Sequence, residues 1–79
     1  MLAQLLAPLL LTVLIQTPAD IQAGWEARGR DGLVHGWAEW TEVEGEITNC
    51  IIHVPPLTAG TLGVWVHEIE HCRSGEYHR

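Results

Sequence analysis

The chain has few positive charges, and they come late in the sequence. It contains no lysine, and the first of its four arginines is Arg28. With ten acidic residues, its formal net charge is −6. Nucleic-acid-binding domains carry basic patches, often interleaved with aromatic residues, and no such run occurs here. The composition therefore argues against a nucleic-acid partner.

The chain also lacks an apolar segment of the length that a membrane-spanning helix needs, which is about 20 residues. Its longest nearly apolar run covers residues 2–15 and is interrupted by Gln4, Pro8 and Thr12. A run of this length is typical of the apolar core of a secretory signal peptide.

A candidate cleavage site follows the apolar run. Thr17-Pro18-Ala19 places small residues at the −3 and −1 positions of a cut after Ala19, and a cut after Ala23 is the second choice. The basic residues that usually precede the apolar core are missing. We predict a signal peptide over residues 1–19 and an exported product, periplasmic or secreted. The alternatives are a retained leader that anchors the chain to a membrane, and a buried core helix.

Cysteine is scarce, because Cys50 and Cys72 are the only two. In an oxidising compartment they are candidates for a disulfide, which would stabilise the fold by about 3 kcal/mol. A pair of buried thiols is one alternative, and Cys72 as a metal ligand is another. The ligand role is disfavoured because Cys72 follows His71 and points about 100° away from it on a helix. No cysteine lies near the candidate cut, which argues against a lipoprotein.

Residues 20–79 are enough for one small domain, whose core is marginal without a disulfide or a metal ion. Strands are predicted at 33–43 and 47–54, joined by a turn into a hairpin that Pro55-Pro56 ends. A helix with Thr58 as its N-cap is predicted to run to about Cys72, whereas residues 23–32 are polar and glycine-rich, with a turn. The predicted fold class is α+β: a β-hairpin packed on one helix, after an apolar leader helix.

The predicted helix carries the motif HExxH at residues 67–71. His67 and His71 are four residues apart, so their imidazoles lie on one face of the helix, one turn from each other. Two imidazoles at this spacing can hold one zinc ion, beside which Glu68 can take a proton from a water on the metal. We therefore predict a Zn²⁺ site with His67 and His71 as ligands and Glu68 as the catalytic base.

A third protein ligand is expected just after the helix. Gly75 can end the helix and turn the chain back, which would bring His78 toward the other two histidines. Glu76 is the alternative third ligand, because zinc also accepts carboxylate oxygens. Tyr77 could stabilise the transition state by donating a hydrogen bond to an oxyanion, and packing on the hairpin is its alternative role.

Side chains of the two predicted strands can also reach this site. His35 and His53 are further candidate ligands, although a half-exposed strand histidine is the simpler interpretation of each. Strand 33–43 is predicted to be an edge strand, which could align an extended peptide by strand addition. Trp37 and Trp40 would then line the groove, unless they form the core of the small domain.

The segment VHEIEHCRSGEYH resembles the zincin metallopeptidases, and the order strand, turn, HExxH helix is similar to their catalytic core. The metzincin motif HExxHxxGxxH differs by one residue, because His78 lies seven positions after His71 rather than six. The chain is more similar to small bacterial and phage-type proteins with HExxHCxxGxxH near the C-terminus. The resemblance covers residues 47–78 and implies a minimal zincin-like domain, with His67 and His71 as zinc ligands and Glu68 as general base.

These features predict a zinc metallopeptidase that hydrolyses peptide bonds in a peptide or protein substrate through a zinc-bound water activated by Glu68. The first alternative is a secreted, non-catalytic module in which zinc holds the fold together. The second is a small membrane-anchored protein in which HExxH is incidental. Glu68 separates the two zinc hypotheses, because a structural zinc site needs no carboxylate at that position.

Overall fold

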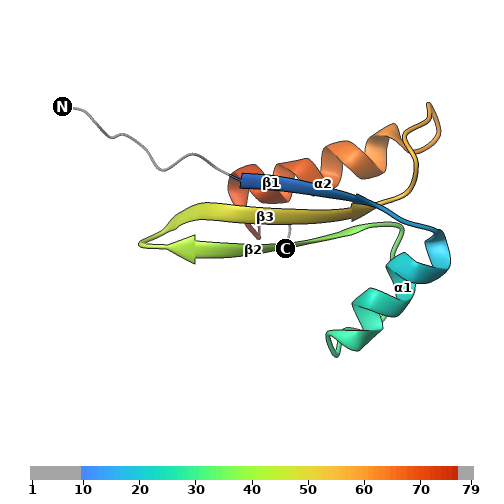
Figure 1. Ribbon diagram of the computed structural model, residues 1–79, viewed down its shortest axis with the longest axis horizontal. Helices are drawn as coiled ribbons and strands as arrows, with labels where there is room; N and C mark the ends of the chain where they lie inside the picture. The colour runs from blue at the N-terminus through green and yellow to red at the C-terminus, as the bar shows by residue number, and fades with distance from the viewer. Residues whose placement is uncertain (1–9, 77–79) are drawn as a thin grey trace.

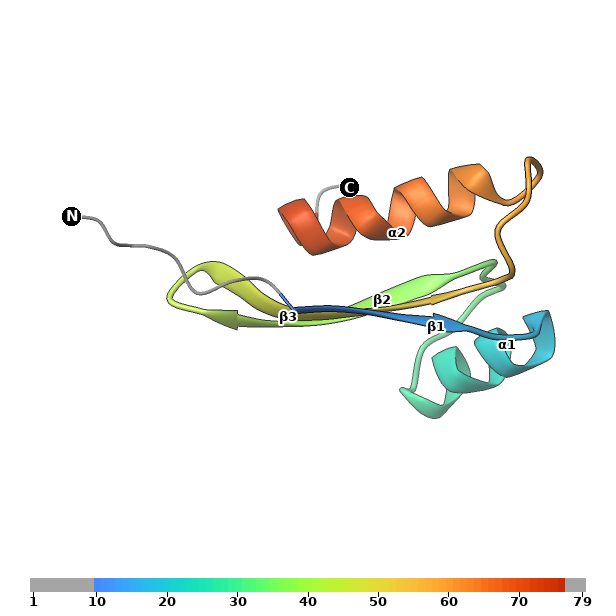
Figure 2. The same cartoon turned by 45° about the horizontal axis from the view of Figure 1, so that its top comes forward.

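The computed structural model describes residues 10–76 and shows a small α+β fold (Figure 1). Its three strands form one sheet in the order β1-β3-β2, with helix α2 on one face and helix α1 on the other (Figure 2). The elements are β1 (Leu10–Ile15), α1 (Pro18–Ala27), β2 (Trp37–Val43), β3 (Glu46–Val54) and α2 (Leu62–Ser74).

The predicted hairpin is confirmed in strands β2 and β3, which pair antiparallel. Glu44 and Gly45 both have positive φ angles, 52° and 84°, as a tight two-residue hairpin turn requires. The first strand of the hairpin, β2, begins later than predicted, at Trp37 instead of residue 33. The reason is that the preceding segment contacts the helices: the Val34 amide donates to the Gln22 side chain at 3.0 Å, and Gly36 packs against α2.

The apolar leader is not helical where the structure describes it. Residues Leu10–Ile15 form strand β1, which pairs in parallel with β3 and makes β3 the central strand. The prediction of a leader helix is therefore wrong for this part, and residues 2–9 lie outside the described range. The β-branched residues of β1 favour an extended chain, and pairing with β3 satisfies its backbone polar groups on one side. Signal-peptide cleavage stays a prediction.

Helix α1 was not predicted from the sequence, because residues 23–32 suggest irregular structure. Its start has clear local causes: the Thr17 hydroxyl accepts from the Asp20 amide at 3.1 Å, and Pro18 occupies the first turn. The buried side chain of Ile21, 1% exposed, anchors the helix to the rest of the fold. Thus Thr17-Pro18-Ala19, interpreted above as a cleavage site, also encodes a helix start.

Helix α2 begins at Leu62, with Thr61 and not Thr58 at the N-cap position. The Thr61 hydroxyl donates to the Pro56 carbonyl at 2.7 Å and accepts from the Thr58 amide at 2.8 Å, so the two threonines close the loop before the helix. The predicted end is confirmed: Gly75, with φ of 70°, donates its amide to the His71 carbonyl at 2.7 Å. Neither helix within residues 10–76 has the length and apolar character needed to cross a membrane.

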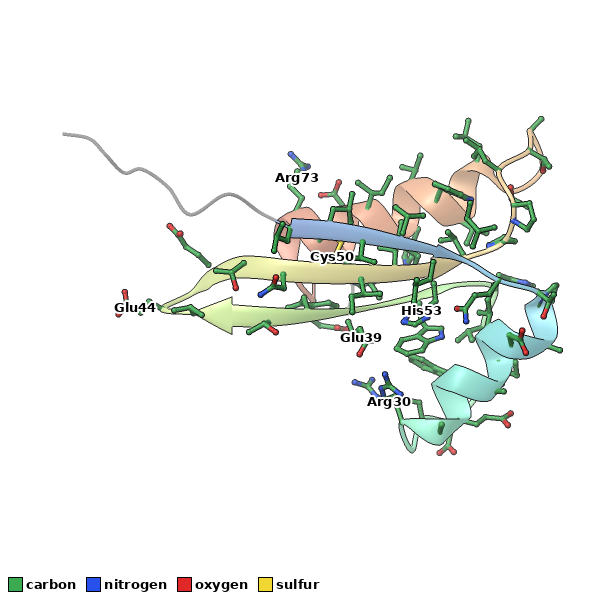
Figure 3. The ribbon with its side chains drawn as sticks, in the orientation of Figure 1. Arg30, Glu39, Glu44, Cys50, His53 and Arg73 are labelled. Carbon is green, nitrogen blue, oxygen red and sulfur yellow. A yellow bond between two sulfur atoms is a disulfide. The ribbon has the colours of Figure 1, made fainter. Side chains whose placement is uncertain are left out.

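A disulfide joins Cys50 of β3 to Cys72 of α2, which confirms the predicted pairing (Figure 3). Both cysteines are buried, and together with Ile52 and Val54 of β3 they form the core between the sheet and α2. Partly buried side chains pack around these four: Ala38, Trp40, Ile47, Val64 and Trp65. The bridge therefore fixes the C-terminal half of α2, where the HExxH motif lies, to the central strand.

Candidate active site

The HExxH motif lies on α2, as the sequence predicts. The rings of His67 and His71 are one turn apart, with centroids separated by 5.0 Å and planes nearly perpendicular. His71 is buried, whereas His67 is exposed. The two imidazoles are thus adjacent on one helix face, with one anchored in the protein and the other reaching solvent.

The His71 ring is held in a defined orientation. Its Nδ1 lies 2.9 Å from the Gly75 carbonyl oxygen, which can only accept, so Nδ1 carries a hydrogen. In the neutral imidazole, Nε2 is then the nitrogen with the lone pair. Trp40 stacks on the ring with a centroid distance of 5.5 Å and an interplanar angle of 13°. A backbone carbonyl on one ring nitrogen is the usual way in which proteins orient a histidine that binds metal through the other.

Glu68 is buried and is 5% exposed. Gly36 covers it so closely that a Cβ at that position would lie 2.7 Å from Val64 and 3.4 Å from the Glu68 Cγ. Burial raises the pKa of Glu68 from its ordinary 4.5 to about 7. Within residues 10–76 the carboxyl group has no hydrogen-bond or ion-pair partner. It is therefore a buried acid that forms no stabilising bond to another described residue.

These side chains line one end of a cleft of about 560 Å³. β2 is an edge strand, and no other strand within residues 10–76 pairs with its outer backbone groups. The cleft runs along this edge from the α2 face to the α1 face. The α2 end is lined by His67, Glu68, His71 and Glu76. Strand β2 contributes Trp37, Ala38, Glu39 and Trp40, and the other end is lined by Trp25, Arg28 and Arg30.

Two imidazoles at this spacing, one with its tautomer fixed, are a donor set that fits a zinc ion. The alternative third ligand Glu76 lines the same cleft as His67 and His71. His78 and Tyr77, the predicted third ligand and transition-state stabiliser, lie outside the described residues. Among residues 10–76, no group of three His, Cys, Asp or Glu side chains is arranged to hold a metal ion.

His53 belongs to the opposite face of the sheet and not to the HExxH site. Its Nδ1 lies 2.8 Å from the Gln16 side-chain oxygen and its Nε2 lies 2.8 Å from Glu39 (Figure 3). Trp37 stacks on its ring at a centroid distance of 3.7 Å. His35 is exposed and shares a hollow beside Gly36 with His67.

Glu39 has the opposite electrostatic surroundings from Glu68. Burial disfavours its ionised form, but hydrogen bonds from His53 and from Arg28, at 3.2 Å, together outweigh that effect and lower its pKa. Arg28 in turn lies over the Trp37 ring, 5.3 Å from its centroid. This partly buried chain of polar contacts ties the C-terminal end of α1 and strand β2 to the central strand.

Three residues of the cleft were not expected from the sequence: Trp25, Arg28 and Arg30. All lie on α1 or just after it, in the segment that the sequence predicts to be irregular. The helix-start pattern at Thr17-Pro18 is the one local signal that could have placed them on an ordered element. Glu70, on the surface of α2, accepts hydrogen bonds from Arg73 and Ser74.

Comparisons with protein-family models, curated proteins and solved structures gave no match to this chain. The resemblance to zincins therefore stays a prediction from the motif.

Proposed function

We propose that this chain is a small zinc-dependent peptidase whose active site is the α2 end of the cleft. One observation carries the proposal: His67, Glu68 and His71 line the same cleft as the outer edge of β2, with which no strand of the described residues pairs. Peptide hydrolysis on zinc requires metal donors and a carboxyl group that takes a proton from water. A strand edge can in addition pair with an extended peptide substrate.

His67 and His71 would hold the zinc, with Glu76 or His78 as third ligand. When bound, zinc supplies Lewis-acid polarisation of the scissile carbonyl and makes water more acidic. Glu68 accepts a proton from the attacking water and delivers it to the leaving amine. The outer edge of β2 donates and accepts main-chain hydrogen bonds, which orient the extended substrate across the helix.

The first test is the zinc content of the purified full chain, measured by elemental mass spectrometry together with hydrolysis of a mixed peptide library. We expect about one zinc per chain. His67→Ala should lose both zinc and hydrolysis, because it removes one of the two imidazole ligands that hold the metal. Ile69→Ala, in the same helix but outside the cleft lining, is the matched control and should keep both. A folded wild-type chain without zinc would contradict the proposal.

The competing hypothesis, a zinc-binding module without activity, is separated by the same experiment. It predicts zinc in the wild type, no hydrolysis of any peptide in the library, and a lower melting temperature after chelation. The buried carboxyl of Glu68, which has no bonding partner among residues 10–76, favours the peptidase, because a purely structural zinc site has no use for it.

A further inference from the structure

We propose that Arg30, at the α1 end of the cleft, binds a carboxylate of the substrate, so that the enzyme prefers peptides with a free C-terminal or acidic side-chain carboxylate. The inference rests on the proposed peptidase function and adds a substrate class to it. It is carried by three features of the described residues: the anchoring of the Arg30 loop, the lack of an acidic partner for Arg30, and the separation of charge along the cleft.

The loop that carries Arg30 is folded back on α1 by three hydrogen bonds. The Arg30 amide donates to the Trp25 carbonyl at 3.3 Å, and the Trp25 indole donates to the Asp31 carbonyl at 2.9 Å. The Gln22 side chain donates to the Gly32 carbonyl at 3.0 Å. The guanidinium of Arg30 then lies over the Trp25 ring, 5.3 Å from its centroid. An exposed arginine is thus held over an aromatic platform.

Arg30 forms no ion pair within residues 10–76, in contrast to the other two arginines in this range. Arg28 is bound to Glu39, and Arg73 is bound to Glu70. A guanidinium that is stacked on tryptophan but not bonded to a carboxylate keeps its planar set of donors available for one.

Charge is divided along the cleft. At the α1 end, Arg28 and Arg30 face the single carboxylate of Glu39, so this end carries an excess of positive charge. At the α2 end, the acidic side chains are Glu68 and Glu76, beside the two histidines. A peptide lying along β2 would therefore place a carboxylate most favourably at the Arg30 end, while its scissile bond lies near Glu68. Figure 3 shows Arg30 at the end of α1 and Glu39 at β2.

The test is binding of labelled peptides to the full zinc-loaded chain carrying Glu68→Gln, which prevents turnover, measured by fluorescence anisotropy. One alanine-rich peptide is compared as free acid and as C-terminal amide, and a second amidated pair differs by an internal Glu or Gln. We expect one carboxylate form to bind about tenfold more tightly than its neutral partner, with the preference weakening as salt rises. The pair that shows the preference identifies the source of the carboxylate.

Arg30→Ala in the same background should abolish the preference, and Arg30→Lys should keep part of it because the charge remains. Arg73→Ala is the matched control: it also removes one positive charge, but from the outer face of α2, and it should leave the preference unchanged. Circular dichroism melts establish that each variant is folded.

Equal binding of acid and neutral peptides, no binding of either, or an undiminished preference in Arg30→Ala would each overturn the inference. The proposed function is judged separately, by zinc content and by hydrolysis of neutral amidated peptides. A peptidase that ignores carboxylates would thus refute the role of Arg30 and leave the function intact.

Discussion

The two faces of the sheet each contain a buried histidine and a glutamate, yet the surroundings of these two pairs are opposite. On the α2 face, Glu68 is buried without a bonding partner within residues 10–76, and desolvation raises its pKa to about 7. On the α1 face, Glu39 bonds to His53 and Arg28, and these bonds lower its pKa despite partial burial.

Under the proposed function, the α2 pair belongs to the catalytic site, whereas the α1 pair holds the fold. A carboxyl group whose pKa is near neutral can both take and give a proton at pH 7, which general acid–base catalysis requires. A carboxylate fixed by hydrogen bonds to an arginine and a histidine is already satisfied, and its removal leaves buried donors unpaired. Residue type alone does not distinguish the two pairs, since both are His and Glu.

The sharpest way to break the comparison is to remove the charge of each glutamate in turn. We expect Glu68→Gln to lower kcat/KM for peptide hydrolysis by about a thousandfold, because it removes the general base, and to keep zinc bound. Glu39→Gln, at the other end of the cleft, should lower kcat/KM much less, because Glu39 takes no part in proton transfer. Equal losses in the two variants, measured by peptide hydrolysis under the same conditions, would contradict the assignment.

A second difference between the faces is the disulfide, which ties only α2 to the sheet. Replacing both Cys50 and Cys72 by alanine should lower the free energy of unfolding by about 3 kcal/mol. Zinc content and activity should fall with it, because α2 positions the histidines, while the Trp37 environment on the α1 face should change less. Denaturant titration followed by tryptophan fluorescence measures the first effect. Unchanged stability in the double variant would show that packing alone holds α2.

A smaller effect is expected from the pH dependence of the α1 face. The folded-state pKa of Glu39 lies below its ordinary value of 4.5, so its contribution to stability is complete above that pH and is lost as pH falls through the folded pKa. Glu39→Gln should cost about 1–2 kcal/mol at pH 7, with a smaller difference from wild type at pH 3. Unfolding titrations of both proteins at the two pH values measure the difference, in which the titration of Glu68 cancels. A difference that grows toward low pH would reverse the assigned sign.

The parts of the fold that depend on local patterns could be predicted from the sequence. The hairpin around Glu44-Gly45, the HExxH helix and its end at Gly75 each follow from residues that are neighbours in the chain. The pairing of Cys50 with Cys72 followed from the assumption of an oxidising compartment. These features place His67, Glu68 and His71 correctly relative to one another.

The remainder depends on contacts between distant segments. Strand β1 exists because it pairs with β3, and its apolar residues alone are equally typical of a leader. Helix α1 has a local start signal at Thr17-Pro18, but the same residues match a cleavage site. Because both elements were assigned to a leader, the α1 end of the cleft, with Arg30, had no place in the sequence-based prediction.

The pairing of β1 with β3 has a consequence for the order in which the chain folds during synthesis. β1 is made first but has no partner until β3 is complete at Val54, whereas the local hairpin of β2 and β3 can close within microseconds. Throughout that interval the apolar segment of β1 has no strand of residues 10–76 to pair with. Once β1 has paired and α1 has formed, Ala19 lies within a helical turn. If the chain is exported, as the sequence predicts, the apolar segment has to be recognised before β3 appears.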